Sequence, residues 1–155
     1  MLEKLRQVCL AFRIAGNLVS YEELKTGNIN RTYKVNTVKS DGSLKSYIVQ
    51  EVNTYVFKNP VWVMENIDRV TEHIRAKRDG KVALHFHHTA EGKTYVFDEH
   101  SFWRLFNYID SDTYNVTTDL EVIRSAGEAF GEFQMMLAKM EEMERIVAEC
   151  MKKYA

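Results

Sequence analysis

Residues 31–52, RTYKVNTVKSDGSLKSYIVQEV, decide the fold because they hold two strand patterns joined by a turn signal. Residues 31–38 and about 46–52 are short runs rich in Val, Ile, Tyr and Thr, the residue types that favour β-strands. The KSDGSLK stretch between them carries Asp41-Gly42, a dipeptide typical of a hairpin turn. We therefore predict two antiparallel strands here.

The residues before this hairpin predict a helix and one more strand. Leu2, Leu5, Cys9 and Phe12 recur at steps of three and four, so an amphipathic helix is expected over about 2–14. It should stop near Gly16, and residues 18–24 should form a strand antiparallel to 31–38.

The loop TGNIN at 26–30, between the first two strands, has two interpretations. Glycine and small polar residues can lay backbone N–H groups and amide side chains over phosphates, as glycine-rich kinase loops do. They are also the ordinary residues of a plain hairpin, and turn statistics alone favour this second interpretation.

A second helix and a second set of strands should follow the hairpin. Asn59 suits an N-cap and Pro60 the first helical position, and Gly80 is a fitting stop. The expected apolar stripe of this helix consists of Val61, Met64, Ile67, Val70 and Ile74. VALHFHH (82–88), KTYVFDE (93–99) and FWRLFNYI (102–109) read as three short strands, with a turn at TAEG between the first two. The predicted fold class is α+β, with helices packed on one antiparallel sheet of about five strands.

From Thr118 onward the only signal is helical. Apolar residues recur at steps of three and four with no Pro or Gly after Gly131, which allows a helix of about 35 residues, or about 50 Å. Such a helix is longer than a small domain is wide. Part of its apolar stripe, at 130–154, should therefore lack a partner within the chain, which suggests a homo-oligomer or a partner helix.

Composition restricts the class of protein. The chain has 155 residues, 45% of them hydrophobic, enough for one domain with a real core. Its formal net charge is −1 with no long run of either sign, so nucleic acid is not an expected partner. Cys9 and Cys150 both lie in helical apolar patterns, which indicates reduced thiols of a core. No stretch reaches the roughly 18 apolar residues of a membrane span, so we expect a cytoplasmic protein without membrane association.

Candidate metal or catalytic residues are few. His85, His87 and His88 are close together, but on a strand His88 would face away from the other two, and no spacing supplies further zinc ligands. Asp110 and Asp112 suit either a cation or, better, the cap of the next helix. The aromatic strand around Trp103 is more typical of a core than of a ligand site. No GxSxG, HExxH or GxxxxGK[ST] motif occurs, so composition and spacing assign neither a catalytic nor a metal site.

Several strings taken together resemble a known family. GNINRTYKV, YIVQEVNTYVFKNPVWVMENIDRVTEHI, FWRLFNYIDSDTYNV and AGEAFGEFQMML are similar to the N-terminal half of the aminoglycoside phosphotransferase/choline kinase-like superfamily, nearest to bacterial N-acetylhexosamine 1-kinases. The resemblance covers about residues 15–138, and the joint occurrence of the strings is more specific than any one of them.

The resemblance implies a kinase-like N-lobe over 1–110, with its N-terminal helix within 1–15, and a linker with the first helix of a truncated C-lobe over 111–155. In this family ATP and Mg²⁺ lie between the lobes. The resemblance places Gly27, Asn28 and Asn30 in the phosphate-covering loop. It places Phe106, Asn107, Tyr108 and Ile109 in the hinge whose backbone meets adenine. Gln50 falls where such kinases often have a phosphate-pairing Lys or Arg, and Glu65 or Glu72 would be its partner on the next helix.

Two departures from the family pattern limit the expected activity. Gln50 carries no positive charge, so another cation such as Arg31 or Lys45 would have to serve, or nucleotide contact is weak. The family's H-x-D-x-x-x-x-N catalytic loop and the segment with its Mg-binding Asp are absent from the 155 residues. We therefore expect an ATP-binding lobe that is catalytically incomplete. The alternative is a non-catalytic interaction module that dimerises or docks a partner through its last helix.

Overall fold

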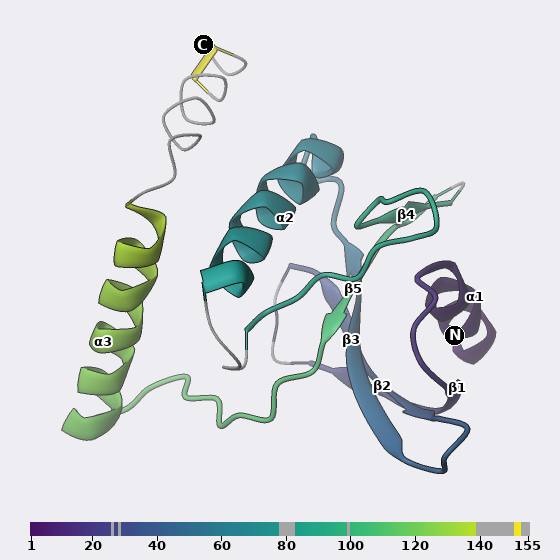
Figure 1. Cartoon of the computed structure of the whole chain (residues 1–155), viewed down its shortest axis with the longest axis horizontal. Helices are drawn as coiled ribbons and strands as arrows, with labels where there is room; N and C mark the ends of the chain where they lie inside the picture. The colour runs from purple at the N-terminus through teal and green to yellow at the C-terminus, as the bar shows by residue number, and fades with distance from the viewer. Residues whose placement is uncertain (26, 28, 78–82, 99, 139–150, 153–155) are drawn as a thin grey trace.

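The computed structural model describes residues 1–25, 27, 29–77, 83–98, 100–138 and 151–152. The chain is an α+β protein whose five-stranded antiparallel sheet has the strand order β1-β2-β3-β5-β4 (Figure 1). The strands are β1 Asn17–Leu24, β2 Arg31–Val38, β3 Leu44–Val52, β4 Val96–Phe97 and β5 Phe102–Asn107. The helices are α1 Leu2–Ala11, α2 Pro60–Lys77 and α3 Leu120–Leu137.

The β2–β3 hairpin forms as predicted. Its strands pair without a bulge from Arg31 opposite Glu51 to Val38 opposite Leu44. In the turn, Gly42 has a φ of +81°, a backbone conformation that favours glycine, and its N–H donates to the Lys39 carbonyl. The Asp-Gly signal therefore identified the turn correctly.

Helix α1 covers one face of the sheet, here called the α1 face. Its buried side chains Leu5, Val8, Cys9 and Phe12 belong to one apolar cluster with buried residues of the sheet. Those sheet residues are Leu18, Tyr33, Val35, Tyr47, Val49, Trp103 and Leu105. The helix ends at Ala11, three residues earlier than the predicted 14. At Gly16 the chain passes so close to β2 that a Cβ would lie 2.6 Å from the Val38 carbonyl oxygen.

Helix α2 lies on the opposite face, the α2 face (Figure 1). The Asn59 side chain accepts a hydrogen bond from the Trp62 N–H at 3.2 Å, as the predicted N-cap requires. Met64 packs with Val52, Phe86 and Phe102 in a second and smaller apolar cluster. The expected stripe is wrong at its first member, because Val61 is exposed. The predicted stop at Gly80 lies outside the described residues.

The prediction of a strand over 82–88 is wrong in the described part of that segment. Phe86 alone makes a β-bridge, to Phe106, while the rest of 83–88 runs along β5 as irregular backbone. The following turn at 89–92 forms as predicted, with the Gly92 N–H donating to the Thr89 carbonyl. The strand predicted over 93–99 is reduced to the two residues of β4.

Helix α3 is capped by Asp119, whose carboxylate accepts from the Glu121 N–H at 2.9 Å. The preferred cap role for Asp110 or Asp112 is therefore wrong, because the helix begins beyond both of them. No α3 residue is buried. Its last turn touches α2, since His73 and Lys77 both contact the Met136 carbonyl, at 3.1 and 2.9 Å. The predicted continuation toward residue 154, and Cys150 with it, falls mostly on residues 139–150 and 153–155, outside the described part.

Among the described residues, no helix has the length and apolar character needed to cross a membrane.

Candidate functional site

An open pocket of about 410 Å³ lies on the α2 face, where the first three strands meet the end of β5. The four residues assigned to the hinge, 106–109 (the hinge segment), all line it. The other lining residues are Glu22, Leu24, Lys34, Ile48, Leu84, Ser111 and Thr113. The volume is in the range of small-molecule sites in proteins.

Sheet register gives this pocket its floor. Lys34 pairs with Ile48 across β2 and β3, and Ile48 pairs with Phe106 across β3 and β5, so the three form one cross-strand row, here called the pocket row. Ile48 and Phe106 supply apolar surface for a flat ring, and the Lys34 ammonium lies 3.9 Å from the centre of the Tyr108 ring. The pocket thus combines an apolar floor with charge at its rim.

The hinge segment is held in place by a short polar network. The Asn107 side chain accepts from the His85 N–H at 2.7 Å and donates to the Ala83 carbonyl at 3.1 Å. The Tyr108 N–H donates to the Ser46 carbonyl at 3.4 Å. For the Ile109 N–H there is no hydrogen-bond partner in the described part of the chain. The Asn107 side chain is therefore committed to structure.

Next to the pocket row lies a second cross-strand row on the same face, here called the arginine row. Gln50 accepts a hydrogen bond from Arg104 Nε at 2.9 Å and donates one to Thr32 Oγ1, also at 2.9 Å. Gln50 therefore joins β5 to β2 through its amide. The pairing expected between Gln50 and a helix glutamate does not form, since Glu65 is exposed and Glu72 contacts Arg75 and His85 instead.

Arg104 is the cation that contacts Gln50 on this face, and the sequence interpretation missed it. Its guanidinium lies 5.5 Å from the centre of the Phe86 ring, with Nη1 3.7 Å from Met64 Sδ. Among the described residues no carboxylate is within ion-pair distance of it. Burial lowers the pKa of Arg104 below its ordinary value. No local signal indicated it, because Arg104 lies opposite Gln50 only through the register of β5 against β3.

The two cations suggested as substitutes for Gln50 lie on the wrong face. Arg31 contacts Glu23 at 3.7 Å and Glu51 at 3.6 Å, and Lys45 lies 5.0 Å from the centre of the Tyr47 ring. Odd-numbered residues of β2 and β3 point to the α1 face, as buried Tyr33 and Tyr47 show, whereas Gln50 points to the α2 face. Neither cation can therefore act beside Gln50.

The loop at 26–30 is only partly described, and Asn28 lies outside the described residues. Asn30 accepts a hydrogen bond from the Asn53 N–H at 3.0 Å, which ties the loop to the end of β3. A Cβ on Gly27 would meet only the Asn30 carbonyl, at the ordinary contact distance of 3.9 Å. Asn30 thus has a structural contact of its own.

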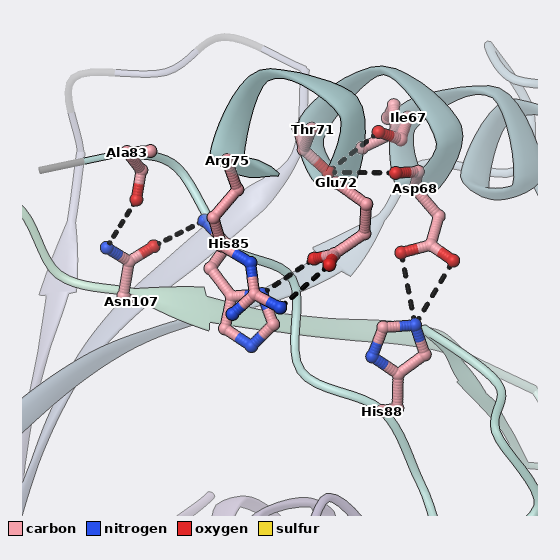
Figure 2. A network of polar contacts seen from close by, with 9 residues as sticks. All are labelled: Ile67, Asp68, Thr71, Glu72, Arg75, Ala83, His85, His88 and Asn107. Atoms are coloured by element: carbon pink, nitrogen blue, oxygen red, sulfur yellow. Dashed lines mark hydrogen bonds and ion pairs between the residues drawn. The ribbon is translucent and has the colours of Figure 1, made fainter. Parts of the chain in front are cut away.

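His85 and His88 form a polar network with α2 (Figure 2). His85 Nδ1 lies 3.0 Å from Glu72 Oε1, and His88 Nε2 lies 3.1 Å from the Asp68 carboxylate. His88 therefore faces α2 together with His85, contrary to the strand prediction. The described residues hold no group of three or more ligands suited to a metal ion.

The charge states in this network follow from burial and neighbours. Burial raises the pKa of Glu72, but hydrogen bonds from Arg75 and His85 outweigh it and bring the pKa below its ordinary value. The pKa of His87 falls to about 4, first because of burial and then because positive charge surrounds it. His87 is therefore neutral at pH 7. The contacts of His85 and His88 hold their segment against α2.

A scan of the chain against the models of known protein families finds no match.

Proposed function

We propose that this chain is the nucleotide-binding lobe of a kinase-like phosphotransferase and is catalytically incomplete by itself. The observation that carries the proposal is the pocket in which the whole hinge segment meets β1, β2 and β3. A helix across the same sheet face, as α2 is, also agrees with a kinase-like N-lobe. In a complete enzyme of the resembled group, Mg²⁺-bound ATP would give its γ-phosphoryl group to the anomeric hydroxyl of an N-acetylhexosamine.

The residues present are better suited to bind a nucleotide than to catalyse phosphoryl transfer. Ile48 and Phe106 can stack on a purine, and the Ile109 N–H can donate to a ring nitrogen. The 155 residues lack an H-x-D-x-x-x-x-N string, so the Asp that orients the attacking hydroxyl has no counterpart here. Glu65 and Glu72 make no contact with Gln50 among the described residues, which leaves the family's charge pair without a counterpart.

Calorimetric titration tests nucleotide binding directly. We expect Mg-ATP and adenosine to bind the chain with micromolar to millimolar dissociation constants, and Ile48→Lys to abolish both by filling the pocket floor with a charge. Leu44→Lys, on the same strand but 72% exposed and outside the pocket lining, is the matched control and should leave both affinities within about twofold. No heat of binding at millimolar nucleotide would contradict the proposal.

A second candidate function, a non-catalytic interaction module, is favoured by one observation. Helix α3 buries none of its residues, and Leu120, Phe130 and Met135 are exposed by 75%, 66% and 73%. Exposed apolar surface of this extent is a common mark of a protein interface. Size-exclusion chromatography with light scattering tests this candidate. A chain that stays strictly monomeric at high concentration would contradict self-association through α3.

A further inference from the structure

Two neighbouring rows on the α2 face differ in chemistry at a fixed spacing. The pocket row contains Ile48 and Phe106, and the arginine row contains Gln50 and Arg104, each two residues away on the same strand. Two residues of strand span about 7 Å. Leu24 lines the pocket and pairs with Thr32 of the arginine row, so the two rows are joined along the β1 side.

Arg104 has donors to spare in this position. A guanidinium carries five N–H groups, and the hydrogen bond to Gln50 uses only the one on Nε. Nη1 rests against a thioether, which is a weak acceptor. Burying a cation costs the free energy of its lost hydration. With no carboxylate beside it, a bound anion would offset that cost.

Gln50 fixes the direction of that guanidinium. Its amide accepts from Arg104 Nε and is itself held by donation to Thr32 Oγ1. An arginine whose plane is fixed in this way loses little rotamer freedom when its remaining N–H groups bind a second group. The planar fork matches the oxygens of a phosphate, which it can bind through two parallel hydrogen bonds.

We propose that Arg104 is the phosphate-binding cation of this site and that Gln50 is its positioning residue. The ligand class that fits is a nucleoside phosphate, with its ring in the pocket row and its phosphate about 7 Å along the sheet, over the arginine row. This inference rests on the proposed nucleotide site. It assigns the positive charge to β5, because β3 carries the neutral Gln50 at the position facing it.

The test compares two ligands that differ only in phosphate. Adenosine and ADP are titrated calorimetrically into the wild-type chain and into Arg104→Gln, with circular dichroism and thermal melting to verify that the variant folds. We expect wild type to bind ADP more tightly than adenosine. Arg104→Gln should lose at least about tenfold in ADP affinity, as expected for a lost charged hydrogen bond, and keep its adenosine affinity.

Two further variants keep the test decisive. Gln50→Leu retains the cation but removes its Nε acceptor, and it should weaken ADP several-fold without changing adenosine. If Arg104→Gln does not fold, the ADP and adenosine affinities of Gln50→Leu provide the test. Arg104→Gln combined with Gln50→Lys returns a positive charge to the same row and should recover part of the ADP affinity.

Each remaining outcome contradicts a specific statement. Equal affinity of the wild type for adenosine and ADP would leave the nucleotide pocket standing and overturn the role of Arg104. An equal loss of both ligands in Arg104→Gln would show that the residue acts through packing. Binding of neither ligand by the wild type would overturn the proposed function and this inference together.

Discussion

The two faces of the sheet use the same strands for different purposes. Along β5, Trp103 and Leu105 lie in the closed apolar cluster under α1, while Arg104 and Phe106 face α2 and the pocket. The α1 face buries large side chains almost completely, and Thr37 is fully buried beneath it as well. The α2 face has one small apolar cluster beside a polar row and an open pocket.

The difference separates a face that stabilises the fold from a face that carries an open pocket. Burial of apolar area on the α1 face supplies most of the stabilising free energy, because it scales with the area removed from water. The α2 face can then carry Arg104 and an open pocket, which contribute little to stability. Changes on the α1 face should therefore affect folding, and changes on the α2 face should affect binding.

The largest expected effect comes from Leu105→Ala on the α1 face. Leu105 is fully buried, so its truncation should lower the free energy of unfolding by about 2–5 kcal/mol through lost burial and a residual cavity. Urea denaturation measures it. The matched control is its neighbour Phe106→Ala, which should cost less stability but remove adenosine binding. Equal stability losses with unchanged binding would erase the distinction between the two faces.

A smaller effect, dependent on pH, should come from His87, whose ring meets the buried Tyr47 of the α1 face edge-on. Its pKa is about 4 in the folded chain, against an ordinary value of 6.5. The unfolded chain therefore binds more protons between these values, so stability falls as pH drops from 6.5 to 4. We expect a loss on the order of 1–3 kcal/mol over that range. His87→Phe should remove this contribution, and an unchanged pH profile in that variant would contradict it.

Glu72→Gln on α2 should cost about 1 kcal/mol, because it weakens the contacts to His85 and Arg75 while the amide keeps part of the hydrogen bonding. Thermal melting at pH 7 measures the loss. Glu65→Gln, on the same helix but exposed, is the control and should be neutral. A larger effect at Glu65 than at Glu72 would mean that the histidine network does not hold α2.

The smallest effect is expected from Arg31→Gln. Its ion pairs with Glu23 and Glu51 are exposed and longer than 3.5 Å, so the loss of stability should be below about 1 kcal/mol. ADP affinity should stay unchanged, because Arg31 lies on the α1 face. A tenfold loss of ADP affinity in this variant, seen by calorimetry, would move the phosphate site away from Arg104.

Local signals in the sequence predicted local structure well. Asp41-Gly42 has the backbone freedom that a hairpin turn demands, and Asn59-Pro60 supplies a cap and a fixed φ, so both elements form where expected. The strand prediction at 82–88 is wrong for the described residues, because their pairing with β5 is limited to one bridge at Phe86, with backbone hydrogen bonds from the His87 N–H to the Leu105 carbonyl and from the Asn107 N–H to the His85 carbonyl. The Asn107 side chain takes the His85 N–H, and the histidine rings meet acids of α2.

By itself, the sequence determined the α+β class, the three strands β1 to β3 and the start of α2. These depend on spacing, caps and turn residues, which act over a few residues. Only the tertiary structure decided which cation accompanies Gln50. Arg104 is 54 residues away in the chain, and its position there depends on the register of β5 against β3. Register is fixed by packing between strands distant in sequence, so no local pattern could reveal it.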